Sequence, residues 1–270
     1  MNEPYFPRLI APAQALVTLR EMLERINYNL EFKRHCEKLK RFSNKPLLSF
    51  IVPTKNEALN LRRLLLSLKY ITDVCEVVNE ILVIDYMSTD GTPKIAKEMG
   101  ARVINVDKPG VGYASYIGVL NAHGDIIIRT DADVIMTPSA IYHVMRALTR
   151  STTKSVATVG HIYYPIDFTT NLLAYLYDKY MRKPYNTTGY FIAFKKSLSK
   201  QINFNPNLRA NDDWDFGLRA YKVLGMDGFY YHYYPAVLVS SRLIRKKGLL
   251  RYLLEASGMT CSTPIPYSQL

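Results

Sequence analysis

The sequence has little cysteine, no long apolar run and no low-complexity segment. Its three cysteines, Cys36, Cys75 and Cys261, lie far apart with no CxxC spacing, which argues against a zinc site or a disulfide framework and favours a reducing compartment. No apolar stretch approaches the ~20 residues that a membrane-spanning helix needs. The N-terminus lacks a basic start followed by an apolar run, so no signal peptide is expected. These absences predict a protein that is soluble or peripheral to a membrane.

The sequence does carry an excess of positive charge. Among 270 residues, 35 are Lys or Arg and 23 are Asp or Glu, which gives a formal net charge of +12 at pH 7. This balance predicts an anionic partner, and nucleic acid, anionic lipid and phosphorylated small molecules all fit it. The chain is 48% hydrophobic, enough to bury one sizeable core.

The two ends of the chain differ from its middle. We expect an N-terminal helical extension over residues 1–45, a central domain over 46–240 and a basic amphipathic segment over 241–270. Helical spacing in the extension is shown by Leu16, Leu19, Leu23, Ile26 and Leu30. In the last segment, Leu243, Leu250 and Leu254 share a helical face among Arg242, Arg245, Lys246, Lys247 and Arg251. Such a face is either solvated or able to lie on anionic lipid.

The central domain alternates between short apolar runs and helical patterns. Strands are predicted at residues 47–53, 80–86, 101–106 and 125–130, with helices at 56–69, 92–100 and 112–124 between them. This alternation is typical of right-handed βαβ units. The predicted fold class is therefore α/β, with a mainly parallel central sheet flanked by helices.

Polar clusters follow three of the predicted strands, and ligands of open parallel sheets bind beyond the carboxyl ends of the strands. The clusters are "PTKNE" from Pro53, "DYMSTDGT" from Asp85 and "DAD" from Asp131. Asp131 and Asp133 follow a buried apolar run, where charge would be costly to bury. They therefore either emerge at the rim of the sheet or hold a cation.

Four segments together resemble a known family. They are "FIVPTKNEALNLRRLLLSL", "EILVIDYMSTDGTPKIAKEMGARV", "GVGYASYIGVLNAHGDIIIRTDADV" and "NDDWDFGLRAYKVLG", in that order. They resemble the nucleotide-diphospho-sugar glycosyltransferases of family 2, which have the GT-A fold, over about residues 46 to 245. "GVGYA" followed by "GDIIIRTDAD" is also similar to the polyprenyl-phosphate sugar synthases within that family.

The resemblance implies a divalent cation, Mn²⁺ or Mg²⁺, that neutralises the diphosphate of a UDP- or GDP-linked sugar donor. By the family pattern, Asp133 is the metal ligand and Asp131 bridges the ribose or the metal. On alternate positions of an extended stretch, the two carboxylates would point the same way. His232 lies where some GT-A enzymes supply a late metal or phosphate ligand, although a lone His in a tyrosine-rich strand is more often structural.

The resemblance also assigns the nucleotide pocket. Pro53, Thr54 and Glu57 match the segment for base and ribose, and Asp85 matches the first Asp of the family's "DDGSTDGT" motif. Lys108 and Arg242 are assigned to the phosphates. Gly110 and Gly112 would allow the backbone to come close to the donor. Tyr86 and Met87 depart from this motif, which leaves the donor open between UDP and GDP. The two glycines can also form a plain turn before a helix.

Inverting transfer needs a base that takes the proton of the acceptor hydroxyl. "NDDWDFGLR" resembles the family's "EDxxL" segment, so the resemblance makes Asp213 the base, with Asp212 and Asp215 as alternatives. Trp214 suits either acceptor stacking or core packing. The expected acceptor is a glycan or a polyprenyl-phosphate-type lipid, and the expected location is the cytoplasm, peripheral on the cytoplasmic membrane face.

Two other functions compete with this one. A sugar-1-phosphate nucleotidyltransferase would need a glycine-rich phosphate loop after the first strand, and "PTKNE" has no glycine. A basic protein that binds nucleotides or nucleic acid without catalysis would not need carboxylates at the rim, because they repel phosphate in the absence of metal. We therefore expect an enzyme with no nucleic-acid partner.

Overall fold

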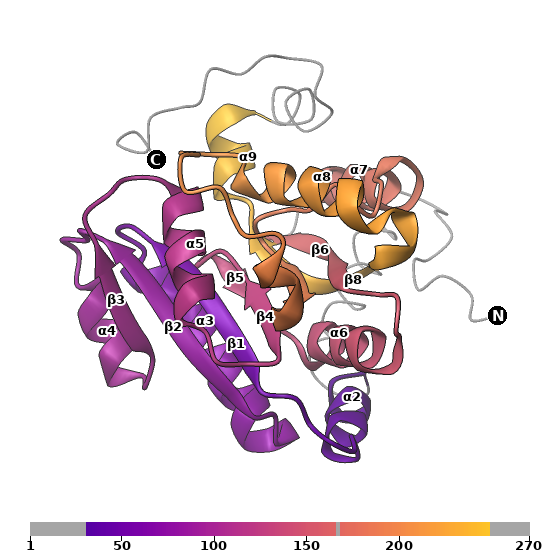
Figure 1. The fold of residues 1–270 in the computed structure, drawn as a ribbon. Helices are drawn as coiled ribbons and strands as arrows, with labels where there is room; N and C mark the ends of the chain where they lie inside the picture. Colours follow the sequence, from indigo (N-terminus) through magenta and orange to yellow (C-terminus); the bar gives the residue numbers. More distant parts are fainter. Residues whose placement is uncertain (1–30, 166–167, 249–270) are drawn as a thin grey trace.

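The computed structural model describes residues 31–165 and 168–248, and its centre is a mixed, mostly parallel sheet (Figure 1). Its strands are β1 (Leu48–Thr54), β2 (Asn79–Tyr86), β3 (Arg102–Val106), β4 (Ile126–Arg129), β5 (Val134–Ile135), β6 (Val156–Tyr164), β7 (Ile192–Lys195) and β8 (Phe229–Ser240), in the order β3-β2-β1-β4-β7-β6-β8-β5. The four strands predicted from the sequence are β1 to β4. Strand β1 pairs in parallel with β2 and β4, and β2 pairs in parallel with β3. β7 is antiparallel to β4 and β6, whereas β8 is parallel to β6.

Helices cover both faces of this sheet (Figure 1). Their bounds are α2 (Glu31–Lys40), α3 (Ala58–Cys75), α4 (Thr92–Glu98), α5 (Val111–Asn121), α6 (Pro138–Arg150), α7 (Phe168–Leu176), the π-helix η1 (Tyr177–Met181), the 3₁₀ turns η2 (Lys196–Lys200) and η3 (Met226–Gly228), α8 (Asp212–Leu224) and α9 (Arg242–Lys247). One apolar core joins α2, α3 and α6 to the sheet, and a second joins α5 and α8. On β1, Phe50 faces the first core and Ile51 the second, so the strand is buried on both faces as parallel strands usually are.

Two helix ends differ from the sequence-based expectation. α3 continues beyond Lys69 to Cys75, because Ile71 and Cys75 extend its buried face. The sequence "TPK" predicts Thr92 as the N-cap and Pro93 as the first helical residue of α4, but Gly91 occupies the N-cap position. Asp90 supplies the cap instead, since its Oδ1 accepts the Thr92 N–H at 3.0 Å. The Asp-Gly turn, rather than the threonine, therefore starts this helix.

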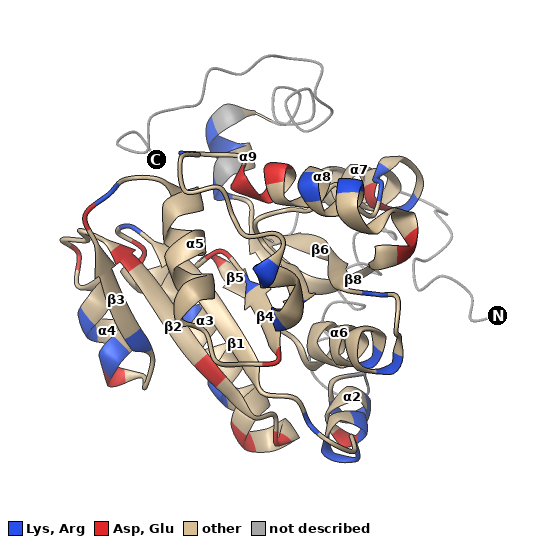
Figure 2. Ribbon diagram, in the orientation of Figure 1, with Lys and Arg blue, Asp and Glu red and all other residues tan. Residues whose placement is uncertain are grey.

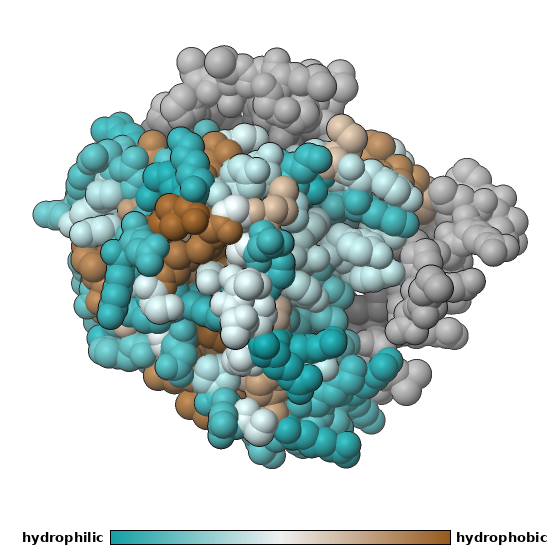
Figure 3. Space-filling model, turned by 45° about the vertical axis from the view of Figure 1, so that its right-hand side comes forward, coloured by the Kyte–Doolittle hydropathy of each residue, from teal (hydrophilic) through white to brown (hydrophobic). Residues whose placement is uncertain are grey.

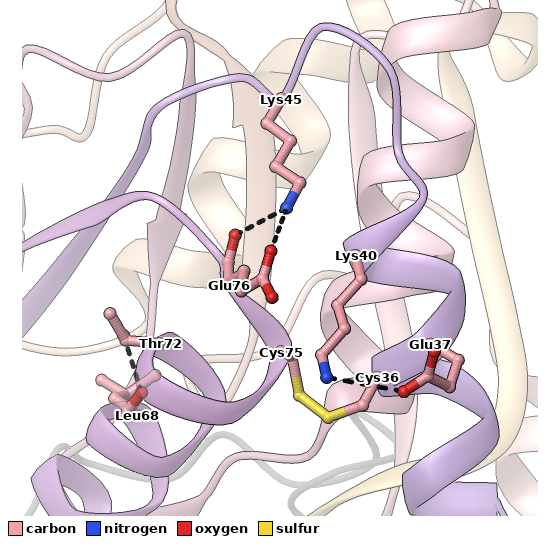
Figure 4. Close-up of a disulfide and its surroundings, with 8 residues drawn as sticks. All are labelled: Cys36, Glu37, Lys40, Lys45, Leu68, Thr72, Cys75 and Glu76. Carbon is pink, nitrogen blue, oxygen red and sulfur yellow. Dashed lines mark hydrogen bonds and ion pairs between the residues drawn. A yellow bond between two sulfur atoms is a disulfide. The ribbon is translucent and has the colours of Figure 1, made fainter.

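The expectation of no disulfide is wrong. Cys36 on α2 is bonded to Cys75 at the end of α3, across a sequence separation of 39 residues (Figure 4). Both residues are buried, and close packing of the two helices brings their Cα atoms to 4.5 Å. Spacing along the chain gave no sign of this proximity, because the pairing depends on the fold. The cysteines therefore no longer favour a reducing compartment.

Reduction of this disulfide should lower the free energy of unfolding by at most about 4 kcal/mol, the loop-closure entropy for a loop of this length. Urea unfolding with and without reductant measures the difference, and the double variant Cys36→Ser/Cys75→Ser should match the reduced protein. Under non-reducing denaturing conditions, alkylation should label Cys261 alone. Labelling of all three cysteines would contradict the disulfide.

The surface combines scattered apolar and hydrophilic residues. Exposed apolar side chains include Leu173 and Leu176 on α7 and Tyr180 and Met181 on η1. On the face drawn in Figure 3, hydrophobic residues are interspersed among hydrophilic ones. Within residues 31–165 and 168–248, no helix is long and apolar enough to cross a membrane.

Several predicted features lie outside the part of the chain that the structure describes. These are the helical leucines of residues 1–30 and the proposed face of Leu250, Leu254 and Arg251. The side chains of Leu243 and Lys247 are likewise not described. Helix α2, immediately before the central domain, is the described part of the N-terminal extension.

Candidate active site

The ends of β1 and β2 meet as the sequence predicts. Thr54 pairs with Asp85 in parallel register, and the Thr54 hydroxyl donates to Asp85 Oδ1 at 2.9 Å. The Ser88 hydroxyl also donates to Oδ1 at 2.6 Å, and the Ser88 N–H donates to Oδ2 at 3.0 Å. Asp85 is buried, as is Pro53 one residue before Thr54. Asp85 thus holds the loop after β2 against the end of β1.

The loops after these two strands are tied together by further hydrogen bonds. The Asn56 N–H donates to the Ser88 hydroxyl at 2.8 Å, and Asn56 Oδ1 accepts the Thr89 N–H at 2.8 Å. Met87 has φ of 49°, in the left-handed region that favours glycine. It stands where the family motif has Gly, so the backbone shape is retained although the residue differs.

Glu57, Asp133 and Arg242 come together at this rim from three separate segments. Arg242 at the start of α9 donates to Glu57 Oε1 at 2.7 Å and lies 3.6 Å from Asp133 Oδ2. The pKa of Asp133 is raised to about 7, by burial first and then by the charges of Asp131 and Glu57, while Arg242 opposes the shift. The charges of Glu57 and Asp131 therefore act on Asp133, and Arg242 compensates them in part.

The "DAD" segment is a turn rather than the extended stretch that was expected. β4 ends at Arg129, and Ala132 and Asp133 form a turn before β5. Asp131 consequently bonds back to Arg129, with Nη1 2.7 Å from Oδ1, while Asp133 faces Arg242. Asp131 thus has Arg129 as its partner and Asp133 has Arg242, and the charge of Asp131 acts on Asp133.

A divalent cation fits this arrangement. Its charge would relieve the repulsion that raises the pKa of Asp133, and carboxylate oxygens are the ligands that Mg²⁺ and Mn²⁺ prefer. In the described part of the chain, no group of three or more His, Cys, Asp or Glu side chains could hold a metal ion. The remaining ligands would therefore have to come from a bound molecule or water, and the phosphate oxygens of a donor are suitable.

Arg129 is a site residue that the sequence reading missed. It is one of the largest fully buried side chains, and it pairs with Asp131 and, at 3.7 Å, with Asp212. Its Nη1 also donates to the carbonyl of Gly189. The Ser115 hydroxyl donates to Asp212 Oδ2 at 2.9 Å. An arginine that ends the apolar run "IIIR" was the available signal, since a buried charge needs buried partners.

Asp213 lies beside this arginine at the acidic start of α8 (Figure 2). Its Oδ2 accepts the Gly189 N–H at 2.6 Å and its Oδ1 accepts the Trp214 N–H at 2.8 Å. Burial raises the pKa of Asp213 to about 6, Asp212 adds to the shift and Arg129 opposes it. A carboxylate with this pKa is able to accept a proton near neutral pH.

The neighbouring candidates have other partners or surroundings. Asp215 Oδ2 is bonded to Arg219 Nη2 at 2.6 Å, an ion pair one turn along α8, which leaves it poorly suited as a base. Trp214 is 42% exposed, so it is not a core residue. Gly189 was also missed, because a single glycine in a loop gives no sequence signal for its contacts.

The structure does not bring His232 to the two aspartates, where the family resemblance would make it a late metal or phosphate ligand. Its ring stacks on that of His143 on α6 with centroids 3.7 Å apart. The pKa of His232 is lowered to about 4, by burial first and then by the charge of His35. Along the neighbouring strand β6, the partners of His232 and Val239 are Val159 and Tyr163, four residues apart, and Val239 also pairs with Val134 next to Asp133. His232 is therefore roughly 13 Å from this end of β8.

The glycines near Lys108 have a structural reason that does not involve a ligand. A Cβ on Gly110 or Gly112 would lie 2.9 Å from the carbonyl oxygen of Leu208, and the Gly112 N–H donates to that oxygen at 3.2 Å. Lys108 Nζ lies 3.5 Å from Asn207 Oδ1 and over the Tyr113 ring. The segment before α8 therefore occupies the space that these glycines leave.

Comparison with known proteins identifies the family. Residues 49–206, more than half of the chain, match the family model described as "Glycosyl transferase family 2". The chain belongs to glycosyl transferase family 2. Because its arrangement of sheet and helices also matches solved members of the GT-A fold, the fold expected from the sequence is confirmed.

Two curated relatives are similar to part of this family 2 protein. A low-salt glycan biosynthesis hexosyltransferase, Agl6, from Haloferax volcanii is 39% identical over 33% of this chain and 21% of its own length. A 4,4'-diaponeurosporenoate glycosyltransferase from Staphylococcus haemolyticus is 33% identical over 46% of this chain and 33% of its own length. The matches thus span no more than a third of these two curated relatives.

Among solved structures, the glucosyl-3-phosphoglycerate synthase of Mycobacterium tuberculosis in complex with Mn²⁺, UDP-glucose and phosphoglyceric acid is similar, with a TM-score of 0.59. It is 20% identical over 86% of this chain and 85% of its own. At this identity the likeness concerns the fold.

The pKa of Asp213 predicts how sugar transfer by this family 2 protein would respond to pH, if Asp213 is the base. A base must be deprotonated to act, so the transfer rate should rise with pH through about 6, where Asp213 loses its proton. Initial rates at saturating donor, measured from pH 5 to 8 in buffers of constant ionic strength, test this. A rate that does not fall on the acid side would contradict Asp213 as the base.

Proposed function

We propose that this family 2 protein is an inverting, divalent-metal-dependent glycosyltransferase that moves a sugar from a nucleotide-diphosphate donor to an acceptor hydroxyl or lipid phosphate. One observation carries the proposal: Arg129 connects Asp131 at the rim to Asp212 at the start of α8. A cation-binding carboxylate pair and a candidate base therefore lie on either side of one buried arginine.

The donor side of the site consists of the rim residues. Asp133 and Asp131 would hold Mn²⁺ or Mg²⁺, whose charge stabilises the departing nucleoside diphosphate. Pro53, Thr54, Glu57 and Asp85 would form the base and ribose pocket at the ends of β1 and β2, and Arg242, paired with Glu57, would lie near the phosphates. Lys108 would add a second cation for the phosphates, and Gly112 would act indirectly, through the contact of its backbone with Leu208. Arg242 is 49% exposed at its side chain, which allows it to move toward a phosphate.

The acceptor side is built around Asp213. Its carboxylate is held by the N–H groups of Gly189 and Trp214, so its orientation is fixed before a substrate arrives. The acceptor hydroxyl would give its proton to Asp213 as its oxygen attacks the sugar carbon from the face opposite the nucleotide. The bond to the diphosphate then breaks and the configuration inverts. Asp212, bound to Ser115 and Arg129, would orient this end of α8.

The acceptor class and the location follow from the surface around Asp213. Trp214 is exposed beside the base and can stack on a sugar ring, while exposed Arg245 and Lys246 on α9 add positive charge. A glycan or polyprenyl-phosphate-type acceptor fits these features. Positive charge also favours the anionic cytoplasmic leaflet, so we propose a location in the cytoplasm, peripheral on the membrane. There the buried Cys36–Cys75 bond would be an exception to the usual reduced state of cytosolic thiols.

A donor screen tests the proposed function. UDP- and GDP-linked sugars are incubated with full-length protein and Mn²⁺, Mg²⁺ or EDTA, with glycan or polyprenyl-phosphate acceptors, and released nucleoside diphosphate is measured. We expect release from one nucleotide class, dependent on metal. A parallel arm with nucleoside triphosphate and sugar-1-phosphate measures pyrophosphate. Pyrophosphate release alone would instead favour a nucleotidyltransferase, and no release in either arm would refute the proposal.

A further inference from the structure

A buried ion cluster on η1 has no part in the roles assigned so far. Asp178 Oδ1 lies 3.3 Å from Arg182 Nη1, and Asp178 Oδ2 lies 3.1 Å from His161 Nδ1 on β6. The side chains of all three residues are at most 7% exposed. A buried charge pair is costly unless its geometry is good and its other polar atoms are bonded. The cluster therefore calls for a role that an apolar core would not fill.

Within the described residues, the other side-chain hydrogen bonds of Arg182 go to one segment, residues 186–190. Its Nε donates to the carbonyl of Asn186 at 2.9 Å and its Nη2 to the Thr188 hydroxyl at 3.1 Å. Its Nη1 also donates to the Tyr190 hydroxyl. The fixed fork of a guanidinium makes such a set of directed bonds, and a lysine cannot make it. Arg182 is thus hydrogen-bonded to both ends and to the middle of this segment.

The centre of the segment touches the proposed reaction site. The Gly189 N–H donates to Asp213 Oδ2 at 2.6 Å, and its carbonyl accepts from Arg129. A Cβ at position 189 would lie 3.0 Å from Asp131 Oδ2. Gly189 is therefore the backbone unit between the proposed base and the proposed donor carboxylate, and a shift of the segment would move both contacts.

The π-helical turn explains how Arg182 reaches this segment. The Arg182 N–H donates to the carbonyl of Tyr177 at 2.9 Å, a bond across five residues. Asp178 and Arg182 both face inward from this turn, whereas Tyr180 and Met181 are exposed. The pKa of Asp178 is lowered, since its burial is outweighed by the charges and hydrogen bonds of His161 and Arg182. Turns of this kind are frequent at functional sites.

We propose that Arg182, held by Asp178, is a positioning residue for sugar transfer: it fixes residues 186–190 so that Gly189 orients Asp213 and Arg129. The inference rests on the proposed function in that Asp213 is taken as the base. Arg182 itself touches no reacting atom in this scheme. Its loss should therefore affect turnover more than donor affinity.

The test compares Arg182→Lys with a matched control, Lys183→Met, which removes the adjacent exposed cation. Hydrogen–deuterium exchange at residues 186–191 should be at least ~10-fold faster in Arg182→Lys, because the bonds to Asn186 and Thr188 are lost. The kcat for nucleoside diphosphate release should fall ~10- to 100-fold, as for a misplaced catalytic group. The Kd of UDP or GDP with Mn²⁺ should change less than twofold, and Lys183→Met should resemble wild type in all three measurements.

A second variant keeps the test informative if Arg182→Lys does not fold. Thr188→Val removes one acceptor of Arg182 while leaving the buried pair intact, and it should show smaller changes in the same direction. Unchanged exchange in both folded variants, or faster exchange with unchanged kcat, would overturn the positioning role. If the wild-type protein releases no nucleoside diphosphate from any donor, the proposed function has failed instead. Exchange alone then decides whether Arg182 holds the segment.

Discussion

Replacing Asp213 by Asn should slow sugar transfer by ~10²-fold or more while leaving the affinity for nucleoside diphosphate and metal nearly unchanged. The amide keeps the shape of the carboxylate but cannot take the proton of the acceptor hydroxyl. Its single oxygen can still accept the Gly189 N–H, the shorter of the two bonds that Asp213 makes with backbone groups. Initial rates of nucleoside diphosphate release and titration calorimetry with the free nucleotide and Mn²⁺ measure the two quantities.

Two neighbouring variants serve as controls for this prediction. Asp215→Asn breaks only the partly exposed ion pair with Arg219, so activity should remain close to that of wild type. Asp212→Asn weakens a buried partner of Arg129 and should lower stability as well as rate. A folded Asp213→Asn protein with wild-type turnover, together with an inactive Asp212→Asn protein of normal stability, would show that the base is Asp212.

The rim of the sheet could be predicted from the sequence because parallel topology determines which strand ends meet. Thr54 and Asp85 belong to predicted strands that are adjacent along the chain, and both residues end those strands. Once the strands are parallel, the polar clusters after them must lie at one edge. The first core also followed from helical spacing, since Leu61, Leu64 and Leu65 share the buried face of α3.

The contacts within the site could not be predicted in the same way. Arg129 contacts Gly189 and Asp212, which lie 60 or more residues further along the chain. The sequence patterns of these segments do not show which of their residues meet. The turn at Ala132 and Asp133 replaces the extended stretch that the sequence predicted, so Asp131 and Asp133 pair with different arginines. The Cys36–Cys75 bond likewise depends on how α2 packs against α3. Long-range packing, rather than local propensity, decides each of these features.

Arg129 gives the two halves of the site a common electrostatic partner. Its guanidinium is shared by Asp131 on the donor side and Asp212 on the acceptor side. A cation bound at Asp131 would compete with Arg129 for that carboxylate, and Arg129 also opposes the raised pKa of Asp213. The proposed donor-binding carboxylates and the proposed base therefore cannot be treated as independent sites, and double variants across Arg129 should show coupling.

Replacing Asp133 by Asn should abolish the stimulation of nucleotide binding by metal while leaving the protein folded. Asp133 is the buried carboxylate whose pKa is raised to about 7, by burial first and then by Asp131 and Glu57. The amide removes one of the anionic oxygens that a divalent cation needs. Titration of UDP and GDP with and without Mn²⁺ measures the effect, and we expect metal to change the Kd of wild type alone.

The same residue predicts a pH effect on stability that does not require a substrate. Because the pKa of Asp133 is higher in the folded protein than its ordinary value of 3.8, the folded state binds the proton more tightly than the unfolded state. Its contribution therefore favours folding at low pH and is lost as pH rises from about 4 to about 7. Without metal, Asp133→Asn should gain stability relative to wild type at pH 8 but not at pH 4, as measured by urea unfolding.

Mn²⁺ should raise the stability of wild type at pH 8, where Asp133 is ionised, and have little effect on the variant. A variant that is less stable than wild type at pH 8 without metal, or one that Mn²⁺ stabilises equally, would mean that the cation is held elsewhere.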